Sequence, residues 1–239
     1  MKALTYQDIN IVYEDNHVLV VVKPQNLGVC PDETGDANLL DLLKQYIKET
    51  YMKTGEVFLG LVHRLDRPTG GVMVFAKTSK AAARLAESIK AGEFEKRYLA
   101  VTIGVPREKH AVLKHALMKD PAKNMVYSVP LATEGGKLAV LEYRTLADVR
   151  NYALLDIRLV TGRSHQARVQ LQTIGTPIFG DRRYAGEKTP AGYNLALWAV
   201  ELRFPHPTTR EILTFRVYPP TDEVPWKAFD IPRLLSLIK

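Results

Sequence analysis

The apolar runs of this chain are short. The longest of them, such as HVLVVV at residues 17–22, have the length of one strand, and none approaches the ~18 apolar residues of a membrane span. Turn residues separate the runs, and hairpins outnumber strand–helix–strand units along the chain. This pattern predicts an α+β fold with a mixed, mostly antiparallel central sheet flanked by helices, and no membrane partner.

Residue periodicity places the expected elements. Residues 9–23 are typical of two strands around a turn at 14–16, and residues 37–50 of an amphipathic helix with Leu39, Leu43 and Ile47 on one face. Further along we expect strands at 72–76, 96–104, 137–149, 152–162, 195–204 and 211–217, the two longer ones joined by a tight turn at 150–151. We expect helices at 80–92, capped by Thr78 or Ser79, from Ser164 to about Ile174, and at 231–238. We expect the strand at 96–104 to be half-buried, and one compact domain over residues 1–239.

Charge and cysteine content restrict the partners. The 33 Lys and Arg residues against 26 Asp and Glu give a net charge of +7, which favours a polyanion such as nucleic acid. The single cysteine, Cys30, excludes an internal disulfide, and the N-terminal residues lack the pattern of a secretory signal. We therefore expect a cytoplasmic protein. The six histidines show no zinc-site spacing, so we expect no metal.

The segment HRLDRPTGG, residues 63–71, is the first candidate site. It places one carboxylate, Asp66, between Arg64 and Arg67, and apolar runs on both sides anchor its ends. Pro68 and the glycine pair at 70–71 favour one particular backbone course. The flanking cations keep such a carboxylate ionised, as a nucleophile or a charge-stabilising group must be. The alternative is an exposed loop acid in a weak surface ion pair.

The segment resembles the His-Arg-Asp of a protein-kinase catalytic loop only superficially. An extra leucine precedes the acid, and the chain has neither a glycine-rich phosphate loop nor Asp-Phe-Gly. A kinase is therefore excluded.

The segment TGRSHQAR, residues 161–168, is the second candidate site. A strand ends at Gly162, and we expect Ser164 to cap the next helix, whose free N–H groups favour an anion. His165 and Arg168 are three residues apart and share a face near that end. The alternative is a capped helix whose polar face is merely solvated.

Taken together, the motifs resemble the RluA family of RNA pseudouridine synthases. The matching segments run from about residue 9 to residue 218, and they are VVVKPQNLGVCP, HRLDRPTGGVMVFAKT, KRYLAVTIG, TGRSHQARVQL with PIFGDRRY, and LALWAVELRFPHP. The resemblance implies the pseudouridine-synthase fold with a central active-site cleft. It also implies isomerisation of uridine to pseudouridine in RNA, without a metal or an organic cofactor.

The resemblance also assigns roles. Asp66 corresponds to the catalytic aspartate, Tyr98 to the tyrosine that packs on the uracil, and Arg168 to the arginine that pairs with the aspartate. Arg64 corresponds to the arginine that fills the gap left by the flipped base. The expected substrate-binding residues are Arg64, Arg67, Lys23, Arg163 and His165.

Three positions depart from the family pattern. Gly70 replaces a serine, Ala167 a larger aliphatic residue and Trp198 a histidine. They concern rate and substrate fit, because no catalytic group is lost. We also expect no N-terminal RNA-binding domain of the S4 type. The basic surface of the catalytic core must then contact the RNA, and the candidate residues are Lys119, Lys123, Arg182 and Arg183.

Two other function classes fit the sequence less well. An inactive RNA-binding module predicts damage at Asp66, Tyr98 or Arg168, and all three are intact. A glycoside hydrolase needs two carboxylates, and for Asp181, the only second candidate, turn capping is the better explanation. Two questions stay open at this stage: whether the substrate is ribosomal or transfer RNA, and whether Asp66 adds to the sugar, adds to the base or assists glycal formation. We expect a monomer.

Overall fold

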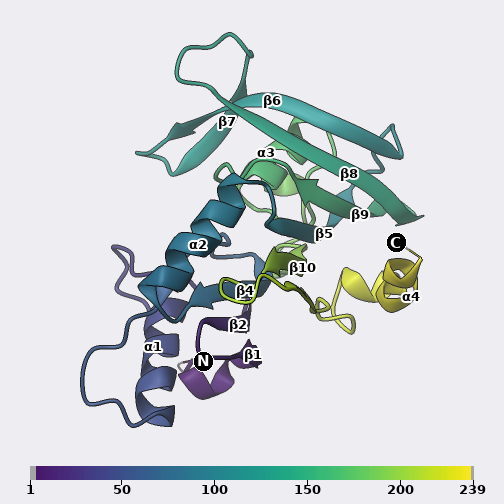
Figure 1. Ribbon diagram of the computed structural model, residues 1–239. Coiled ribbons are helices and arrows are strands. Elements are labelled where there is room, and N and C mark those ends of the chain that lie inside the picture. Colours follow the sequence, from purple (N-terminus) through teal and green to yellow (C-terminus); the bar gives the residue numbers. More distant parts are fainter. Residues whose placement is uncertain (1–3, 238–239) are drawn as a thin grey trace. The chain divides into compact units, whose positions relative to one another are not determined.

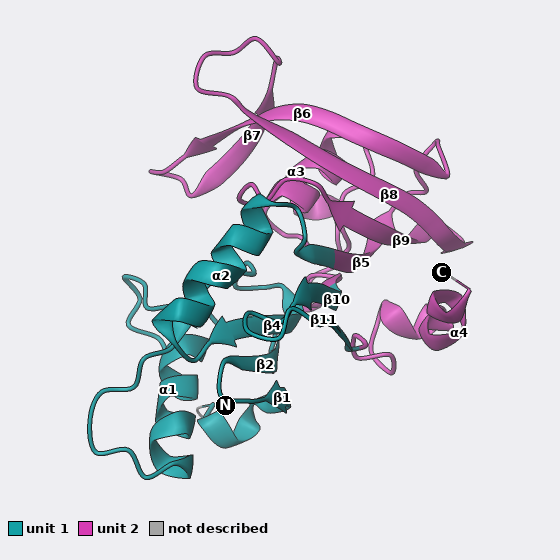
Figure 2. Ribbon diagram, viewed as in Figure 1, with its two compact units in different colours: residues 1–96, 199–217 teal, residues 97–198, 218–239 magenta. Residues whose placement is uncertain are grey.

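The computed structural model describes residues 4–237. The chain forms two compact units, Met1–Lys96 with Ala199–Val217 and Arg97–Trp198 with Tyr218–Lys239 (Figure 2). The prediction of a single domain stays a prediction. No helix in the described range is long and apolar enough to cross a membrane.

Unit 1 is built on a sheet with helices beside it, and β1–β2, β2–β4, β3–β4 and β10–β11 pair antiparallel (Figure 1). The strand order is β1, β2, β4 and β10, with β3 beside β4 and β11 beside β10. The elements are η1 (Tyr6–Asp8), β1 (Asn10–Glu14), β2 (Val18–Lys23), α1 (Leu39–Thr50), β3 (Gly60–Leu61), β4 (Gly70–Ala76), α2 (Ser79–Lys90), β10 (Leu197–Pro205) and β11 (Ile212–Arg216).

The hydrophobic core of unit 1 explains why these segments form these elements. Every residue of β4 is buried, and its alternate residues Val72 and Val74 pack with Leu85 of α2. The α1 residues Leu39, Leu43 and Ile47 are at most 1% exposed, which confirms the predicted helical face. Caps begin both helices: the side chain of Asn38 accepts the Asp41 N–H, and that of Thr78 accepts the Ala81 N–H.

Unit 2 carries an antiparallel sheet in the order β5, β9, β8, β6 and β7. The elements are β5 (Glu95–Ile103), β6 (His110–Asp120), β7 (Met125–Val129), β8 (Lys137–Val149), β9 (Tyr152–Leu159), α3 (Gln166–Thr173), η2 (Gly186–Lys188), η3 (Trp226–Ala228) and α4 (Ile231–Ser236). The turn predicted at 150–151, between the long strands β8 and β9, is confirmed, with Arg150 at a φ of 55°.

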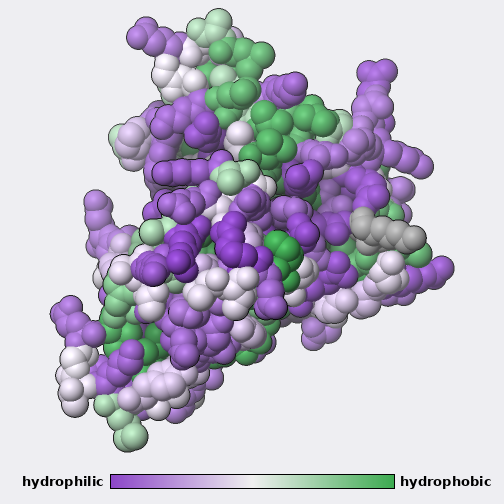
Figure 3. All heavy atoms as spheres, in the orientation of Figure 1, coloured by the Kyte–Doolittle hydropathy of each residue, from purple (hydrophilic) through white to green (hydrophobic). Residues whose placement is uncertain are grey.

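One face of the unit 2 sheet packs on α3. Val169 of α3 contacts a buried cluster with Leu117, Val126 and Ala139. Alternate residues face the other way, and Val112 and Leu138 are about half exposed there. Figure 3 shows hydrophobic side chains gathered over β6, β7 and β8. The sheet is therefore covered on one side by α3 and reaches solvent on the other, which explains the alternating burial of β6.

The structure corrects several expectations. The hairpin β6–β7 was not predicted, and β5 is buried on both faces from Tyr98 to Thr102, so the half-buried strand expected there is wrong. Helix α3 begins at Gln166, and its N-cap is His165 without a side-chain cap bond, so Ser164 does not cap it. The last position of the C-terminal helix predicted at 231–238 lies outside the described residues. The α+β class is confirmed.

Candidate active site

The loop that carries Asp66 is fixed at both ends within unit 1. Leu65 is buried, Arg64 is exposed, and Asp66 is half-buried between Leu65 and a turn closed by the Thr69 N–H on the Asp66 carbonyl (3.0 Å). Strand β4 begins at Gly70. Gly71 has a φ of 125°, and a Cβ there would lie 2.3 Å from the carbonyl oxygen of Ala199. Only glycine fits at this position, so the course of the loop into β4 is determined by its packing on β10.

His63 anchors the start of the loop in the core. Its Nε2 accepts the Val74 N–H at 3.1 Å, and its ring meets Phe94 edge-on at 5.3 Å. Burial, and then the charge of Lys96, lower the pKa of His63 to about 3. The ring is therefore neutral at physiological pH and acts as an anchor.

Lys23 joins the Lys-Pro segment to the catalytic loop. Its side chain has no exposed surface, and its Nζ donates to the carbonyls of Pro24 (2.9 Å), Leu27 (2.7 Å) and Arg67 (3.0 Å). Burial lowers the pKa of Lys23 to about 7, while the charge of Asp66 acts to raise it and that of Arg67 to lower it. The substrate contact expected of Lys23 stays a prediction. In the structure its buried ammonium engages three carbonyls and holds the loop.

Arg67 is engaged with the loop at residues 32–36. Its Nη2 lies 2.6 Å from Asp32 and its Nη1 2.7 Å from Asp36, and the guanidinium is about one third exposed. A hydrogen bond from Thr34 and then one from Arg67 lower the pKa of Asp32 to about 2. The two carboxylates therefore determine where the Arg67 side chain lies.

In unit 2 the TGRSHQAR segment is organised by Gln166. Its Oε1 accepts the Arg163 N–H (3.0 Å) and the Thr161 hydroxyl (2.8 Å), and its Nε2 donates to the Val140 carbonyl (2.9 Å). The Arg163 side chain is exposed and donates through Nε to the Leu138 carbonyl at 3.0 Å. The glutamine side chain thus fixes the backbone just before α3, which begins without a side-chain cap bond. The anion site at this helix start stays a prediction.

Arg168 is buried on α3 and has a carboxylate partner in its own unit. Its Nε and Nη2 each donate to Asp181 at 2.7 Å, and its Cζ lies 5.0 Å from the ring centroid of Tyr184. His165 contacts the same tyrosine, with Nδ1 2.7 Å from the hydroxyl oxygen. The predicted shared face of His165 and Arg168 is therefore confirmed, and Tyr184 lies against it.

Tyr98 lies on the α3 side of the same sheet. It pairs with Ile157, which pairs with Tyr143 in the next strand, and Tyr143 shares its face with Ala139 of the α3 cluster. Tyr98 is 6% exposed. The structure therefore brings Tyr98, Arg168 and His165 to one side of the unit 2 sheet, and Asp66, Arg64, Arg67 and Lys23 to one loop system in unit 1.

Sequence reasoning missed four residues of these two sites. Asp32 and Asp36 hold Arg67, while Asp181 and Tyr184 hold Arg168. Asp181 was expected to cap a turn, and it does: its Oδ1 accepts the N–H groups of Arg183 and Tyr184 at 3.2 Å. Its ion-pair partner, Arg168, lies thirteen positions earlier in α3. No periodic pattern relates the two positions, so the sequence did not indicate this pair.

Comparison with known proteins places the chain in a family. Residues 17–173 match the family model described as RNA pseudouridylate synthase. The chain is 35% identical, over 231 residues, to the ribosomal large subunit pseudouridine synthase D of Pasteurella multocida (strain Pm70), covering 90% of this chain and 69% of that relative. The chain belongs to the RNA pseudouridylate synthase family. It is an isomerase that converts uridine in RNA to pseudouridine, which confirms the resemblance found in the motifs.

Solved structures agree with this family. The chain is similar to human RNA pseudouridylate synthase domain containing 4, with a TM-score of 0.73, 25% identity, and 88% of each chain covered. A second structure, human RNA pseudouridylate synthase domain containing 1, has a TM-score of 0.70 at 21% identity, with 92% of this chain and 87% of that one covered, and supports the fold alone. Both support the pseudouridine-synthase fold.

Proposed function

We propose that this pseudouridine synthase acts on uridine in large-subunit ribosomal RNA. The support is the name of the relatives that match over most of the chain, ribosomal large subunit pseudouridine synthase D. The net charge of +7 suits an RNA partner. Ribosomal RNA is thereby favoured over transfer RNA.

We propose Asp66 as the catalytic carboxylate. The observation that carries this role is the rigid loop around it, held by buried Leu65, by Gly71 against β10 and by the Lys23 bond to the Arg67 carbonyl. A carboxylate that assists cleavage has to be held within a fraction of an ångström of the reacting atoms. The C1′–N1 bond breaks, the uracil turns, and C5 bonds to C1′. N1 gains a proton as C5 loses one, so the atoms balance without a cofactor.

Base flipping explains the other roles. Extruding a nucleotide from stacked RNA costs a few kcal/mol. Arg64 lies two residues before Asp66 and is exposed, so burial does not restrict its side chain as it restricts that of Lys23. Its guanidinium therefore suits the gap left by the base. Tyr98 offers a flat apolar face and a hydroxyl to the uracil. We propose Arg168 as a catalytic residue that supplies a fixed guanidinium to the reaction.

The basic surface of unit 2 suits the RNA backbone. Lys119, Lys123, Arg182 and Arg183 are all exposed. The Arg183 Nη1 donates to the Asn124 carbonyl at 2.6 Å, which ties the 181–184 segment to the tip of the β6–β7 hairpin. Arg163 and His165 lie at the start of α3 in the same unit, and we propose that both, together with Arg67, contact the substrate.

Pseudouridine mapping tests target and nucleophile together. Ribosomal RNA from cells without this gene should lack one or more large-subunit pseudouridines, and the wild-type gene should restore them. Asp66→Asn should restore none, whereas Asp148→Asn, an exposed acid at the end of β8, should restore all of them. Full modification by Asp66→Asn would exclude the nucleophile, and changes confined to transfer RNA would exclude the substrate.

We further propose that the whole chain acts as one catalytic domain and as a monomer in the cytoplasm, where ribosomal RNA is available in bacteria such as those of the relatives. Sedimentation of the purified chain tests the monomer.

A further inference from the structure

Asp181 is the most enclosed carboxylate among the described ion pairs, and its place is set by the backbone before it. Its side chain has no exposed surface. Gly180 has a φ of 77°, and a Cβ there would lie 2.0 Å from the Asn194 carbonyl oxygen. The Gly180 N–H also donates to the Thr189 hydroxyl at 2.7 Å. The backbone leading into Asp181 therefore has one available course, which only glycine permits.

Four donors converge on this one carboxylate. Arg168 donates from Nε to Oδ2 and from Nη2 to Oδ1, both at 2.7 Å, while the backbone N–H groups of Arg183 and Tyr184 reach Oδ1. A fork of two parallel bonds fixes the plane of a guanidinium as well as its distance. The two backbone donors hold the Asp181 carboxylate in one orientation, and the carboxylate in turn orients the guanidinium.

Tyr184 holds the guanidinium from a second direction. Its ring lies 5.0 Å from Arg168 Cζ, and its hydroxyl accepts the Val126 N–H at 3.0 Å and meets His165 Nδ1 at 2.7 Å. The ring therefore belongs to a network that spans the 181–184 segment, α3 and β7. Arg168 is held in its plane by a carboxylate and on its face by an aromatic ring.

We propose that Asp181 is a positioning residue for the reaction, which orients the Arg168 guanidinium, with Tyr184 as the second support of the guanidinium. This rests on the catalytic role proposed for Arg168. Asp181 touches neither base nor sugar in this scheme and acts through the arginine. Its effect is therefore on the rate of the chemical step, and RNA affinity is left unchanged.

Asparagine is the informative replacement. An amide keeps the shape of Asp181 but replaces one acceptor oxygen by an N–H donor, so it cannot accept from both Arg168 nitrogens and the two backbone groups. The matched control is Asp156→Asn, which removes another arginine–aspartate pair of unit 2, with Arg97. Asp156 pairs with Leu99 and so lies on the face opposite Tyr98 and α3.

Single-turnover tritium release from 5-³H-uridine-labelled ribosomal RNA of cells without the gene measures the rate. Filter binding of the same RNA measures affinity. We expect Asp181→Asn to lower the rate at least 10-fold with affinity within 2-fold, and Asp156→Asn to keep the wild-type rate. In an Arg168→Ala background, Asp181→Asn should add less than a 2-fold further loss, because its effect passes through the arginine.

The outcomes separate two kinds of failure. An impaired Arg168→Ala with a fully active Asp181→Asn overturns the inference alone, and so do losses that multiply in the double variant. An Arg168→Ala protein with the wild-type rate overturns the catalytic role of Arg168 and the inference with it. If Asp181→Asn does not fold, Tyr184→Leu replaces it. We then expect a several-fold loss that disappears in the Arg168→Ala background, and a wild-type rate would overturn the inference.

Discussion

Lys23 shows how one buried side chain supports a catalytic loop. Its ammonium has no exposed surface, and its three acceptors belong to two segments, residues 24–27 and the loop at Arg67. Hydrogen bonds from a charged donor are stronger than neutral ones, and a buried carbonyl left without a donor is costly. The lysine therefore contributes mainly to the stability of the loop.

Replacing Lys23 tests this role. Lys23→Met leaves three carbonyls, that of buried Leu27 and those of half-buried Pro24 and Arg67, without this donor. We expect the free energy of unfolding to fall by about 2 kcal/mol or more, since an orphaned buried acceptor costs about 1–3 kcal/mol and removal of the buried charge offsets part of the loss. Urea denaturation measures the change, with Lys48→Met on the exposed side of α1 as the control. Equal stability of the two variants would contradict the role.

The pKa of Lys23 gives this position a pH dependence. Burial lowers the pKa of Lys23 to about 7, whereas the pKa of a lysine in the unfolded chain is ~10.4. Between these values the unfolded state binds the extra proton, so the stability of the wild type relative to Lys23→Met rises with pH, by at most about 1.4 kcal/mol per pH unit. Denaturation at pH 7, 8 and 9 measures the slope. A difference that stays constant over this range would show that Lys23 remains charged.

Gly71 is the second decisive residue of the loop. A Cβ at this position would lie 2.3 Å from the Ala199 carbonyl oxygen, and the φ of 125° is unsuitable for alanine. We expect Gly71→Ala to lower the free energy of unfolding by roughly 3 kcal/mol or to prevent folding, because the start of β4 would have to move away from β10. Gly55→Ala, with open space around it, is the control for thermal unfolding. Equal melting temperatures would refute this packing.

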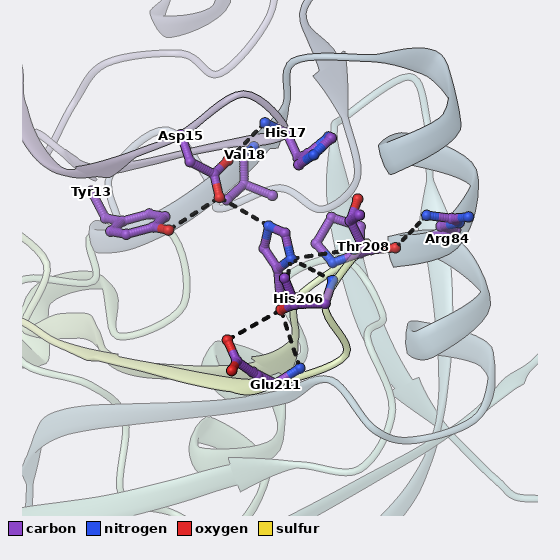
Figure 4. Close-up of polar contacts among 10 residues, drawn as sticks. Tyr13, Asp15, His17, Val18, Arg84, His206, Thr208 and Glu211 are labelled. Atoms are coloured by element: carbon purple, nitrogen blue, oxygen red, sulfur yellow. Dashed lines mark hydrogen bonds and ion pairs between the residues drawn. The ribbon is translucent and has the colours of Figure 1, made fainter.

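At the scale of elements, one histidine–aspartate pair joins two turns of unit 1 (Figure 4). His206, after β10, lies with its Nε2 2.9 Å from Asp15 in the β1–β2 turn, and its Nδ1 accepts the Thr209 N–H at 2.9 Å. The other Asp15 oxygen accepts the N–H groups of His17 and Val18 at 2.7 Å. Because Nδ1 is an acceptor, Nε2 carries the proton and donates to Asp15.

Asp15→Asn tests the connection between these turns. Its amide N–H₂ would face the donating Nε2 of His206 or the two backbone donors, so we expect a loss of about 2 kcal/mol in unfolding free energy. Burial raises the pKa of Asp15, but the N–H groups of Val18 and His17 and the Tyr13 hydroxyl bring it below its ordinary value. The stabilisation is then present above about pH 4 and disappears as the pH falls through the lower folded pKa. Denaturation at pH 7, 5 and 3 measures it, and a wild-type advantage that persists unchanged at pH 3 would contradict it.

The elements themselves were predictable where their pattern is local. The α1 stripe, the Thr78 cap and the turn at Arg150 follow from residues a few positions apart. The start of α3 was not predictable, because the Gln166 side chain, and not a serine cap, fixes the backbone there through Thr161, Arg163 and Val140. The bond to Val140 depends on β8 lying beside the helix.

At the scale of the whole molecule, charge determines how RNA binds. Each phosphate neutralised on a single strand contributes roughly −0.7 to the log–log slope of affinity against salt. If the four basic residues of unit 2 contact phosphate, replacing them by glutamine should flatten the slope by about 3 units. These residues are Lys119, Lys123, Arg182 and Arg183. Filter binding at salt concentrations between about 50 and 300 mM measures the slope.

The control removes the same charge elsewhere. It replaces four exposed lysines of unit 1, namely Lys48, Lys53, Lys80 and Lys90. These side chains belong to α1, α2 and the segment after α1. We expect a smaller change of slope, because none of them is part of the basic surface proposed to contact phosphate. An equal change in both variants would indicate that net charge alone attracts the RNA, and an affinity independent of salt would exclude the electrostatic account.

The sequence by itself determined the α+β class, most of the strands, the two long amphipathic helices and the order of motifs that identifies the family. Each of these depends on residues close together in the chain, or on a motif that is read directly. The tertiary structure alone decided the partners: Asp181 for Arg168, three carbonyls for Lys23, and Asp15 for a histidine 191 residues away. Such contacts form between segments that only the fold brings together, and no periodicity within one element reports them.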